Sequence, residues 1–161
     1  MVELSKTHGE VGAKVRFPPP LVFLGLLLLG VGVDRFFPLA MGGARIVWVA
    51  LGALVALAGI ALVLWAGKWF ERTGQAPAPW KPSPELILSG PYRFTRNPMY
   101  LGMFFTQVGL GLALRNPWIA LLAPASLAVV HAIAVRPEEA YLEEKFGEPY
   151  RRFKQSVRRY L

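Results

Sequence analysis

A short stretch ahead of an apolar segment carries the residues best suited to chemistry in this chain. It runs from Gly90 to Gly102 and reads GPYRFTRNPMYLG, with two arginines, two prolines and two tyrosines. Asn97 followed by Pro98 is a typical helix start, with asparagine as the N-cap and proline as the first helical residue. Because helix N-termini attract anions, Arg96 beside this start predicts a site for a carboxylate or a phosphate.

A second polar cluster, of sequence RPEE, follows a later apolar segment and ends in Glu138 and Glu139. Acids in the first turn suit the positive end of a helix, so capping is one explanation. The other is that these acids face Arg93 and Arg96 and bind a zwitterion, which offers an ammonium group and a carboxylate. For the first cluster, the simpler alternative is that Arg93 and Arg96 anchor a membrane surface and Tyr100 belongs to an aromatic belt.

The two clusters meet only if the apolar segments between them form a hairpin. Residues 97–114 and 117–135 carry no charge. Each segment is about 18 to 19 residues long, which is enough to cross a bilayer core. Only Arg115 and Asn116 connect them, and Asn116-Pro117 is again an N-cap followed by a first-turn proline. The sequence therefore predicts antiparallel transmembrane helices that return the chain to the side it left.

Composition places the whole chain in a membrane. Of its 161 residues, 54% are hydrophobic and only 17% are charged, which is too apolar for a soluble domain of this size. Two further apolar segments, 17–37 and 46–68, precede the hairpin. The expected fold is an all-α membrane protein, a single domain over 1–161, with about four transmembrane helices and a C-terminal amphipathic helix at the membrane interface.

Basic residues predict the orientation of these spans. Most of the 18 lysines and arginines fall on one side, and only Arg35, Arg45 and Arg115 fall on the other. We therefore expect a multi-pass protein of the inner (cytoplasmic) membrane with both termini in the cytoplasm. The net charge of +8 indicates anionic lipid headgroups as partners and no nucleic acid, because the cations flank spans and no aromatic-basic binding module is visible.

Two segments should then lie on the cytoplasmic side. Residues 71–96 contain five prolines and are expected to form a loop. The tail, 137–161, is expected to form two short helices separated at Gly147, with basic residues around an apolar face. The residues of that face are Tyr150, Phe153, Val157, Tyr160 and Leu161. This pattern predicts a basic amphipathic tail that lies on the membrane surface and contributes to the site.

Metal-binding residues are scarce. The chain has no cysteine and only two histidines, His8 and His131, so no thiolate site or histidine cluster can form and no metal is expected. His131 lies near the end of the last predicted span. We expect it to form a hydrogen bond within the helices rather than to act in catalysis.

Both polar clusters resemble motifs of the integral-membrane methyltransferases that include isoprenylcysteine carboxyl methyltransferases and phospholipid methyltransferases. The stretch from Gly90 to Gly102 is similar to the family's G-P-Y-x-x-x-R-[H/N]-P-x-Y-x-G signature. The stretch from Glu138 to Tyr150 is similar to its E-E…F-G-x-x-Y element. Two motifs in the right order cover the second half of the chain, which makes the resemblance specific.

The resemblance implies an S-adenosylmethionine-dependent methyltransferase, with the cofactor entering from the cytosol and a lipid-like acceptor entering from the bilayer. The residues that it places at the cofactor are Arg96, Asn97, Pro98, Tyr100, Gly102, Glu138 and Glu139. The turn before them aims Tyr92 and Arg93 toward the start of the third span, and we expect these two residues to bind the cofactor as well. Arg96, Tyr100 and Glu139 are the expected catalytic residues. This agrees with the zwitterion site, because the methionine part of the cofactor carries an ammonium group and a carboxylate.

The methyl acceptor stays open at this stage. Isoprenylcysteine enzymes commonly have histidine where this chain has Asn97, and asparagine does not titrate near neutral pH. A carboxylate or thiolate acceptor needs no base. A phospholipid or other membrane amine needs one, for which Glu139, Glu138 and Tyr100 are the candidates. The alternative class is a non-catalytic assembly factor or transporter, which would explain the spans but not the paired arginine and glutamate clusters.

Overall fold

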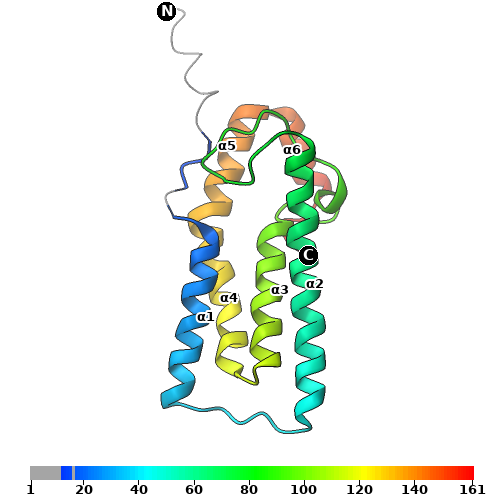
Figure 1. Ribbon diagram of the computed structural model, residues 1–161. Coiled ribbons are helices and arrows are strands. Elements are labelled where there is room, and N and C mark those ends of the chain that lie inside the picture. Colours follow the sequence, from blue (N-terminus) through cyan, green and yellow to red (C-terminus); the bar gives the residue numbers. More distant parts are fainter. Residues whose placement is uncertain (1–11, 16) are drawn as a thin grey trace, which may run out of the picture. The chain divides into compact units, whose positions relative to one another are not determined.

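The computed structural model of the protein describes residues 12–15 and 17–161 (Figure 1). Three residues that contribute to the sequence predictions lie outside the described residues. They are the histidine His8 and two of the basic residues that predict the orientation, Lys6 and Arg16. The described part of the chain is helical and has no strand, as predicted. Its elements in chain order are α1 (Pro19–Phe36), α2 (Arg45–Arg72), η2 (Gly90–Arg93), α3 (Pro98–Ala113), α4 (Pro117–Val130), η3 (His131–Val135), α5 (Arg136–Phe146) and α6 (Glu148–Ser156).

Three helical stretches in the described residues are long and apolar enough to cross a membrane. They are α1, α2 and the continuous stretch Pro117–Phe146, which joins α4, η3 and α5. α3 has only 16 residues, which is about 24 Å of helix against a bilayer core of about 30 Å. The structure therefore indicates a multi-pass membrane protein, and the fourth span over 97–114 stays a prediction.

The chain divides into two compact units. The first contains Trp65–Pro98 and His131–Leu161 together with the described residues before α1, and the second contains Pro18–Leu64 and Met99–Val130. Most of the polar residues singled out from the sequence belong to the first unit. Tyr100 belongs to the second, as does Gly102.

Glycines let α2 and α3 pack closely in the second unit. A Cβ atom at Gly59 would lie 2.6 Å from the Gly102 carbonyl oxygen, and one at Gly102 would lie 2.7 Å from the Gly59 carbonyl oxygen. Gly52 and Gly109 form a second contact of this kind, at 2.6 Å in both directions. Small residues thus bring the two backbones together, as is common between membrane helices.

Polar side chains stabilise the start of α4 and its packing in the same unit. Asn116 caps the helix as predicted, because its Oδ1 accepts a hydrogen bond from the Ile119 amide at 3.3 Å. On α3, Gln107 donates to the Ile119 carbonyl at 3.1 Å and accepts from the Ser126 hydroxyl at 2.8 Å. Gln107 and Ser126 are both buried. Their hydrogen bonds satisfy polar groups that would otherwise be costly in an apolar interior.

In the first unit, the long connection between α2 and η2 is fixed by specific contacts. The Ser83 amide donates to the Tyr141 hydroxyl of α5 at 3.1 Å. At the end of the connection, Gly90 has a φ of +63°, and a side chain there would overlap the indole of Trp69. Glycine is therefore required for both conformation and space. This turn places η2 directly before residues 95–97.

The two tail helices, α5 and α6, meet at Gly147, which has a φ of +59°. In α6, Tyr150 and Phe153 are buried, whereas Arg151 and Arg152 are exposed. The helix ends at Ser156, and the next residue has an extended backbone. The predicted helical face is therefore wrong in its last part, Val157, Tyr160 and Leu161, because the chain has left the helix there.

The glycine contacts predict opposite effects for two matched substitutions. Gly109→Ala should destabilise the protein by about 1 to 3 kcal/mol, because the added methyl group meets the backbone of α2. Gly25→Ala, on α1, meets no atom of the described residues within 4 Å and should stabilise it by about 0.5 to 1 kcal/mol through helix propensity. Thermal unfolding of both variants in the same detergent measures the difference. Equal shifts would contradict close packing at Gly109.

Candidate functional site

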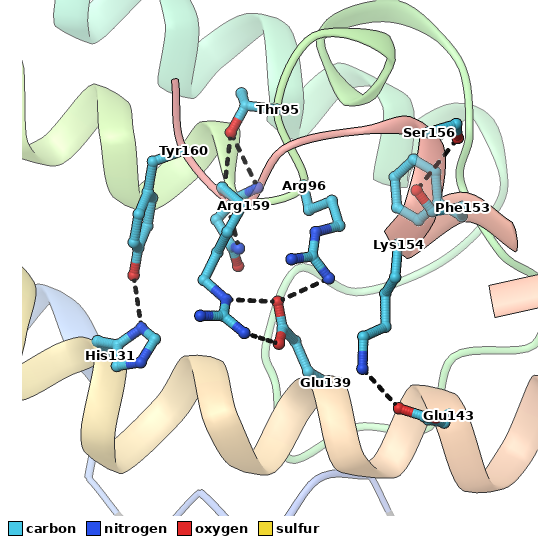
Figure 2. A network of polar contacts seen from close by, with 11 residues as sticks. Thr95, Arg96, His131, Glu139, Glu143, Phe153, Lys154, Ser156, Arg159 and Tyr160 are labelled. Atoms are coloured by element: carbon cyan, nitrogen blue, oxygen red, sulfur yellow. Dashed lines mark hydrogen bonds and ion pairs between the residues drawn. The ribbon is translucent and has the colours of Figure 1, made fainter. Parts of the chain in front are cut away.

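Three segments that are distant in sequence meet around one carboxylate in the first unit (Figure 2). They are residues 95–97 after η2, the first turn of α5, and the extended residues 157–161 after α6. The sequence predicts the first two segments. It also predicts that the tail contributes to the site, but it places residues 157–161 on a helix, whereas they are extended.

Glu139 is the carboxylate at the centre of this cluster, and it is only 8% exposed. The Arg159 guanidinium binds it in a bidentate manner, with Nε 3.0 Å from Oε1 and Nη2 2.9 Å from Oε2. Arg96 Nη1 lies 3.2 Å from Oε1. The structure thus brings Arg96 and Glu139 together, as predicted. It also shows that they touch each other directly, with Arg159 on the same carboxylate.

Arg96 retains unused hydrogen-bonding capacity. Its side chain is 9% exposed, yet its Nε and Nη1 atoms have no hydrogen-bond partner among the described residues. A buried donor without a partner costs about 1 to 3 kcal/mol, and more when it is charged. Two guanidinium groups also outnumber the single Glu139 carboxylate. Both features favour an anionic group beside Arg96.

The extended C-terminal segment is held by the signature residues. The Arg96 amide donates to the Arg158 carbonyl at 2.9 Å. The Arg159 carbonyl accepts two hydrogen bonds, from Thr95 Oγ1 at 3.0 Å and from Asn97 Nδ2 at 3.2 Å. The side chain of Asn97, which the resemblance assigns to the cofactor, is thus bonded to the protein's own C-terminal segment.

A further contact fixes the end of this segment. The Tyr160 hydroxyl lies 3.0 Å from His131 Nδ1 (Figure 2). His131 is the first residue of η3, a π-helical turn, and such turns are frequent at functional sites. The structure thus confirms that His131 has a hydrogen-bond partner. That partner comes from the C-terminal segment and not from another apolar helix.

Two buried tyrosines interact with the acids in the first turn of α5, Tyr92 with Glu138 and Tyr150 with Glu139. Burial raises the pKa of the Tyr92 phenol above its usual value, and the charge of Glu138 adds to the rise. Burial also raises the pKa of Tyr150, with a further rise from Glu139 and an opposing effect of Arg96. Both phenols therefore stay neutral at physiological pH and can donate hydrogen bonds.

The remaining predicted residues lie in different surroundings. Arg93 is exposed, which fits its alternative role as a surface anchor, and Pro98 is buried at the start of α3. Glu138 is partly exposed. In the second unit, Tyr100 is buried, and Gly102 provides the close approach to α2. The structure therefore gives Gly102 a packing role, and its predicted contact with a cofactor stays a prediction.

Sequence reasoning missed Thr95, Arg159 and Tyr160. Thr95 lies at a variable position of the signature, and the two C-terminal residues belong to a basic tail that suits a membrane surface. Both Thr95 and Asn97 bind a backbone carbonyl, which every residue type offers. One signal in the sequence could have indicated Arg159. A buried Glu139 needs a cationic partner, so an arginine of the tail could have been expected beside it.

Fold and site together define a helical membrane protein with an ionic cluster built from segments that flank its apolar helices. Residues 47–149 match the family described as phospholipid methyltransferase. The chain belongs to this family, which confirms the resemblance drawn from its two motifs. It is a membrane methyltransferase by family.

Individual relatives match shorter stretches. An uncharacterized protein of Haemophilus influenzae is 40% identical over 63 residues, which are 39% of this chain and all of that protein. The protein-S-isoprenylcysteine O-methyltransferase of Saccharomyces cerevisiae is 35% identical over 72 residues, 45% of this chain and 30% of the enzyme. The nickel-cobalt-cadmium resistance protein NccN of Alcaligenes xylosoxydans xylosoxydans is 32% identical over 66 residues, 41% of this chain and 31% of that protein. No solved structure matches the chain.

The hydrogen bonds to the Arg159 carbonyl predict how the C-terminal segment is held. Replacing both donors, with Thr95→Val and Asn97→Ala, should remove about 1 kcal/mol each and loosen the segment at least about tenfold. Trypsin cleavage after Arg158, followed by mass spectrometry, measures this opening. Thr73→Val is the matched control, because that hydroxyl bonds only near its own helix end. Equal cleavage of all proteins would contradict the assigned role of Thr95 and Asn97.

Proposed function

We propose that the protein is an S-adenosylmethionine-dependent methyltransferase of the inner membrane that acts on a lipid-like acceptor. The observation that carries the proposal is the nearly buried Arg96, whose Nε and Nη1 make no hydrogen bond to the described residues although Nη1 is in an ion pair with the buried Glu139. Membership of the phospholipid methyltransferase family supports the reaction class. The name of the relative from Saccharomyces cerevisiae, a protein-S-isoprenylcysteine O-methyltransferase, supports a lipid-linked acceptor by analogy.

The residues present fit the amino-acid part of this cofactor. Arg96 Nε and Nη1 are suited to bind its carboxylate, which would satisfy donors that are otherwise orphaned. Glu138, beside Glu139 on the same helix, is suited to attract its ammonium group, because Arg96 and Arg159 already pair with Glu139. When bound, S-adenosylmethionine supplies a methyl group on an activated sulfonium.

The chain's own groups contribute orientation and exclusion of water. Arg96 and Glu139 are each about nine-tenths buried at their side chains, so their charges act in a medium of low polarity. The neutral Tyr150 phenol closes one side of the cluster. If the acceptor is an amine, a group must take its proton, and Glu138, Glu139 and Tyr100 stay the proposed candidates. The proposed cofactor contacts of Asn97, Pro98 and Gly102 rest on the resemblance.

The acceptor part of the proposal draws on an apolar pocket in the second unit. The pocket has a volume of about 270 Å³ and is lined by α1, α2 and α3. Its wall includes Phe23, Leu64 and Met103, and its polar members are Thr106 and Gln107. Such a lining suits an aliphatic chain and offers no charge to a soluble metabolite.

The proposed membrane arrangement has four spans, with α3 as the short third one of the predicted hairpin. Both termini and the ionic cluster lie on the cytoplasmic side, where most basic residues are found. α6 lies along the interface, with Tyr150 and Phe153 turned inward and Arg151 and Arg152 available to anionic headgroups.

The cofactor proposal predicts the effect of removing the central acid. Glu139→Ala removes the carboxylate that holds Arg96 and Arg159 together, so the two like charges should separate and S-adenosylmethionine binding should weaken by at least about tenfold. Isothermal titration calorimetry on the purified protein in detergent measures the affinity. Competition by the demethylated product confirms that the heat comes from the cofactor site.

The control for this experiment is Glu143→Ala, one turn further along α5. Glu143 pairs with Lys154 at 2.7 Å and is not part of the ionic cluster. Its replacement should leave the affinity within about twofold, since half-exposed ion pairs contribute little. If the unsubstituted protein does not bind S-adenosylmethionine, the proposed methyltransferase function is rejected. The alternative, a non-catalytic membrane protein, would then be favoured.

The acceptor proposal predicts that the apolar pocket matters for transfer and not for cofactor binding. Met103→Trp fills the pocket and should lower methyl transfer to extracted membrane lipid by at least about fivefold. The cofactor affinity should not change. Phe105→Trp is the control, because Phe105 lies on the same helix outside the pocket lining.

Methyl-labelled cofactor and membrane lipid provide the readout. If treatment with base releases the label, the product is a methyl ester of a carboxylate. If the label resists base, the product carries an N-methyl group. Transfer to a water-soluble acceptor that is equally fast in both tryptophan variants would contradict a lipid-like acceptor.

A further inference from the structure

The C-terminal segment contributes both side chain and backbone to the ionic cluster. Residues 158–160 make hydrogen bonds to all three residues of the 95–97 segment and to His131. Arg159 is the central member, because its carbonyl binds Thr95 and Asn97 while its guanidinium binds Glu139. No residue of this segment belongs to the two motifs.

We propose that Arg159 is a positioning residue of the cofactor site, which holds the Glu139 carboxylate so that Arg96 remains free to bind the carboxylate of the ligand. This inference rests on the proposed function. It assigns a role to the third segment of the site and makes the C-terminal segment a fixed wall of that site.

The geometry of the shared carboxylate carries the first step. Arg159 occupies both oxygens of Glu139 through a bidentate pair at 2.9 and 3.0 Å, the strongest arrangement between these groups. Arg96 reaches one of those oxygens at 3.2 Å, in an ion pair that does not satisfy its Nη1 as a hydrogen-bond donor. Glu139 thus attracts Arg96 but leaves its Nε and Nη1 hydrogen bonds available.

The second step concerns charge. The cluster holds two cations and one anion, and Arg96 and Glu139 are both about nine-tenths buried at their side chains. The hydrogen bond to Glu139 raises the pKa of Arg159 further, so this guanidinium stays charged at any pH of interest. Without Arg159, the remaining pair would be neutral, and Arg96 would bind Glu139 instead of a ligand carboxylate.

The third step is that the backbone anchors Arg159 in place. If Arg159 instead occupied the place of the ligand, it would have to leave the site easily when the ligand binds. Here three backbone carbonyl contacts and the Tyr160 hydroxyl fix the residues on both sides of the side chain. These contacts favour a permanent part of the site over a displaceable occupant.

The decisive variants are Arg159→Gln, Glu139→Gln and the double variant, each tested for binding of S-adenosylmethionine and for methyl transfer. Arg159→Gln keeps the backbone contacts, and we expect its Kd and KM for the cofactor to rise at least about tenfold with kcat within about twofold. In the Glu139→Gln background, the same substitution should have no further effect, because Arg159 acts through Glu139. Added guanidinium ion should restore part of the affinity of Arg159→Ala.

Arg152→Gln is the matched control, since Arg152 is a basic tail residue with a 78% exposed side chain whose ion-pair partner is Glu148, outside the ionic cluster. It should bind as the unsubstituted protein does. If Arg159→Gln fails to fold, Arg159→Lys answers the same question, because lysine keeps the charge and loses the bidentate geometry. Its affinity must then still fall.

The remaining outcomes each reject a stated claim. Unchanged binding by Arg159→Gln, or additive effects in the double variant, would reject the positioning role. Tighter binding would show that Arg159 competes with the ligand, which also rejects it. If the unsubstituted protein does not bind the cofactor, the proposed function fails first, and that result is distinguishable from all of these.

Discussion

The burial of one carboxylate between two guanidinium groups is the interaction on which the site depends. Removing a carboxylate from water costs several kcal/mol, and only close, well-aligned cations offset that cost. Glu139 obtains them from Arg96 and Arg159, which lie far from it in sequence. A single buried charge therefore determines where the segment after η2, the first turn of α5 and the C-terminal segment meet.

The same constraint explains why the neighbouring polar groups are arranged as they are. The C-terminal segment has no strand partner, so its carbonyls need other donors, and Arg96, Thr95 and Asn97 supply them. Tyr150 and Tyr92 stay neutral because burial raises their pKa values. They therefore add no charge near the acids of α5.

The sequence predicts the parts of this arrangement that side-chain type determines. Apolar length gives the long helices, Asn116 before Pro117 gives the cap of α4, and opposite charges bring Arg96 to Glu139. The C-terminal segment was not predictable in the same way. Arg158 and Arg159 look like any basic residues of an amphipathic tail, and no glycine or proline marks the end of the helix at Ser156.

The close contact of Gly59 with Gly102 differs in kind from the contact of Asn97 with the Arg159 carbonyl. Two glycines whose backbones touch limit each other's volume, so evolutionary changes at these positions are expected to be correlated. A side chain that binds a carbonyl places no demand on the identity of the residue that offers it. Among relatives, correlated substitutions should therefore trace the α2–α3 packing and the pair of Glu139 with Arg159, while the hydrogen bonds of Thr95 and Asn97 leave no such record.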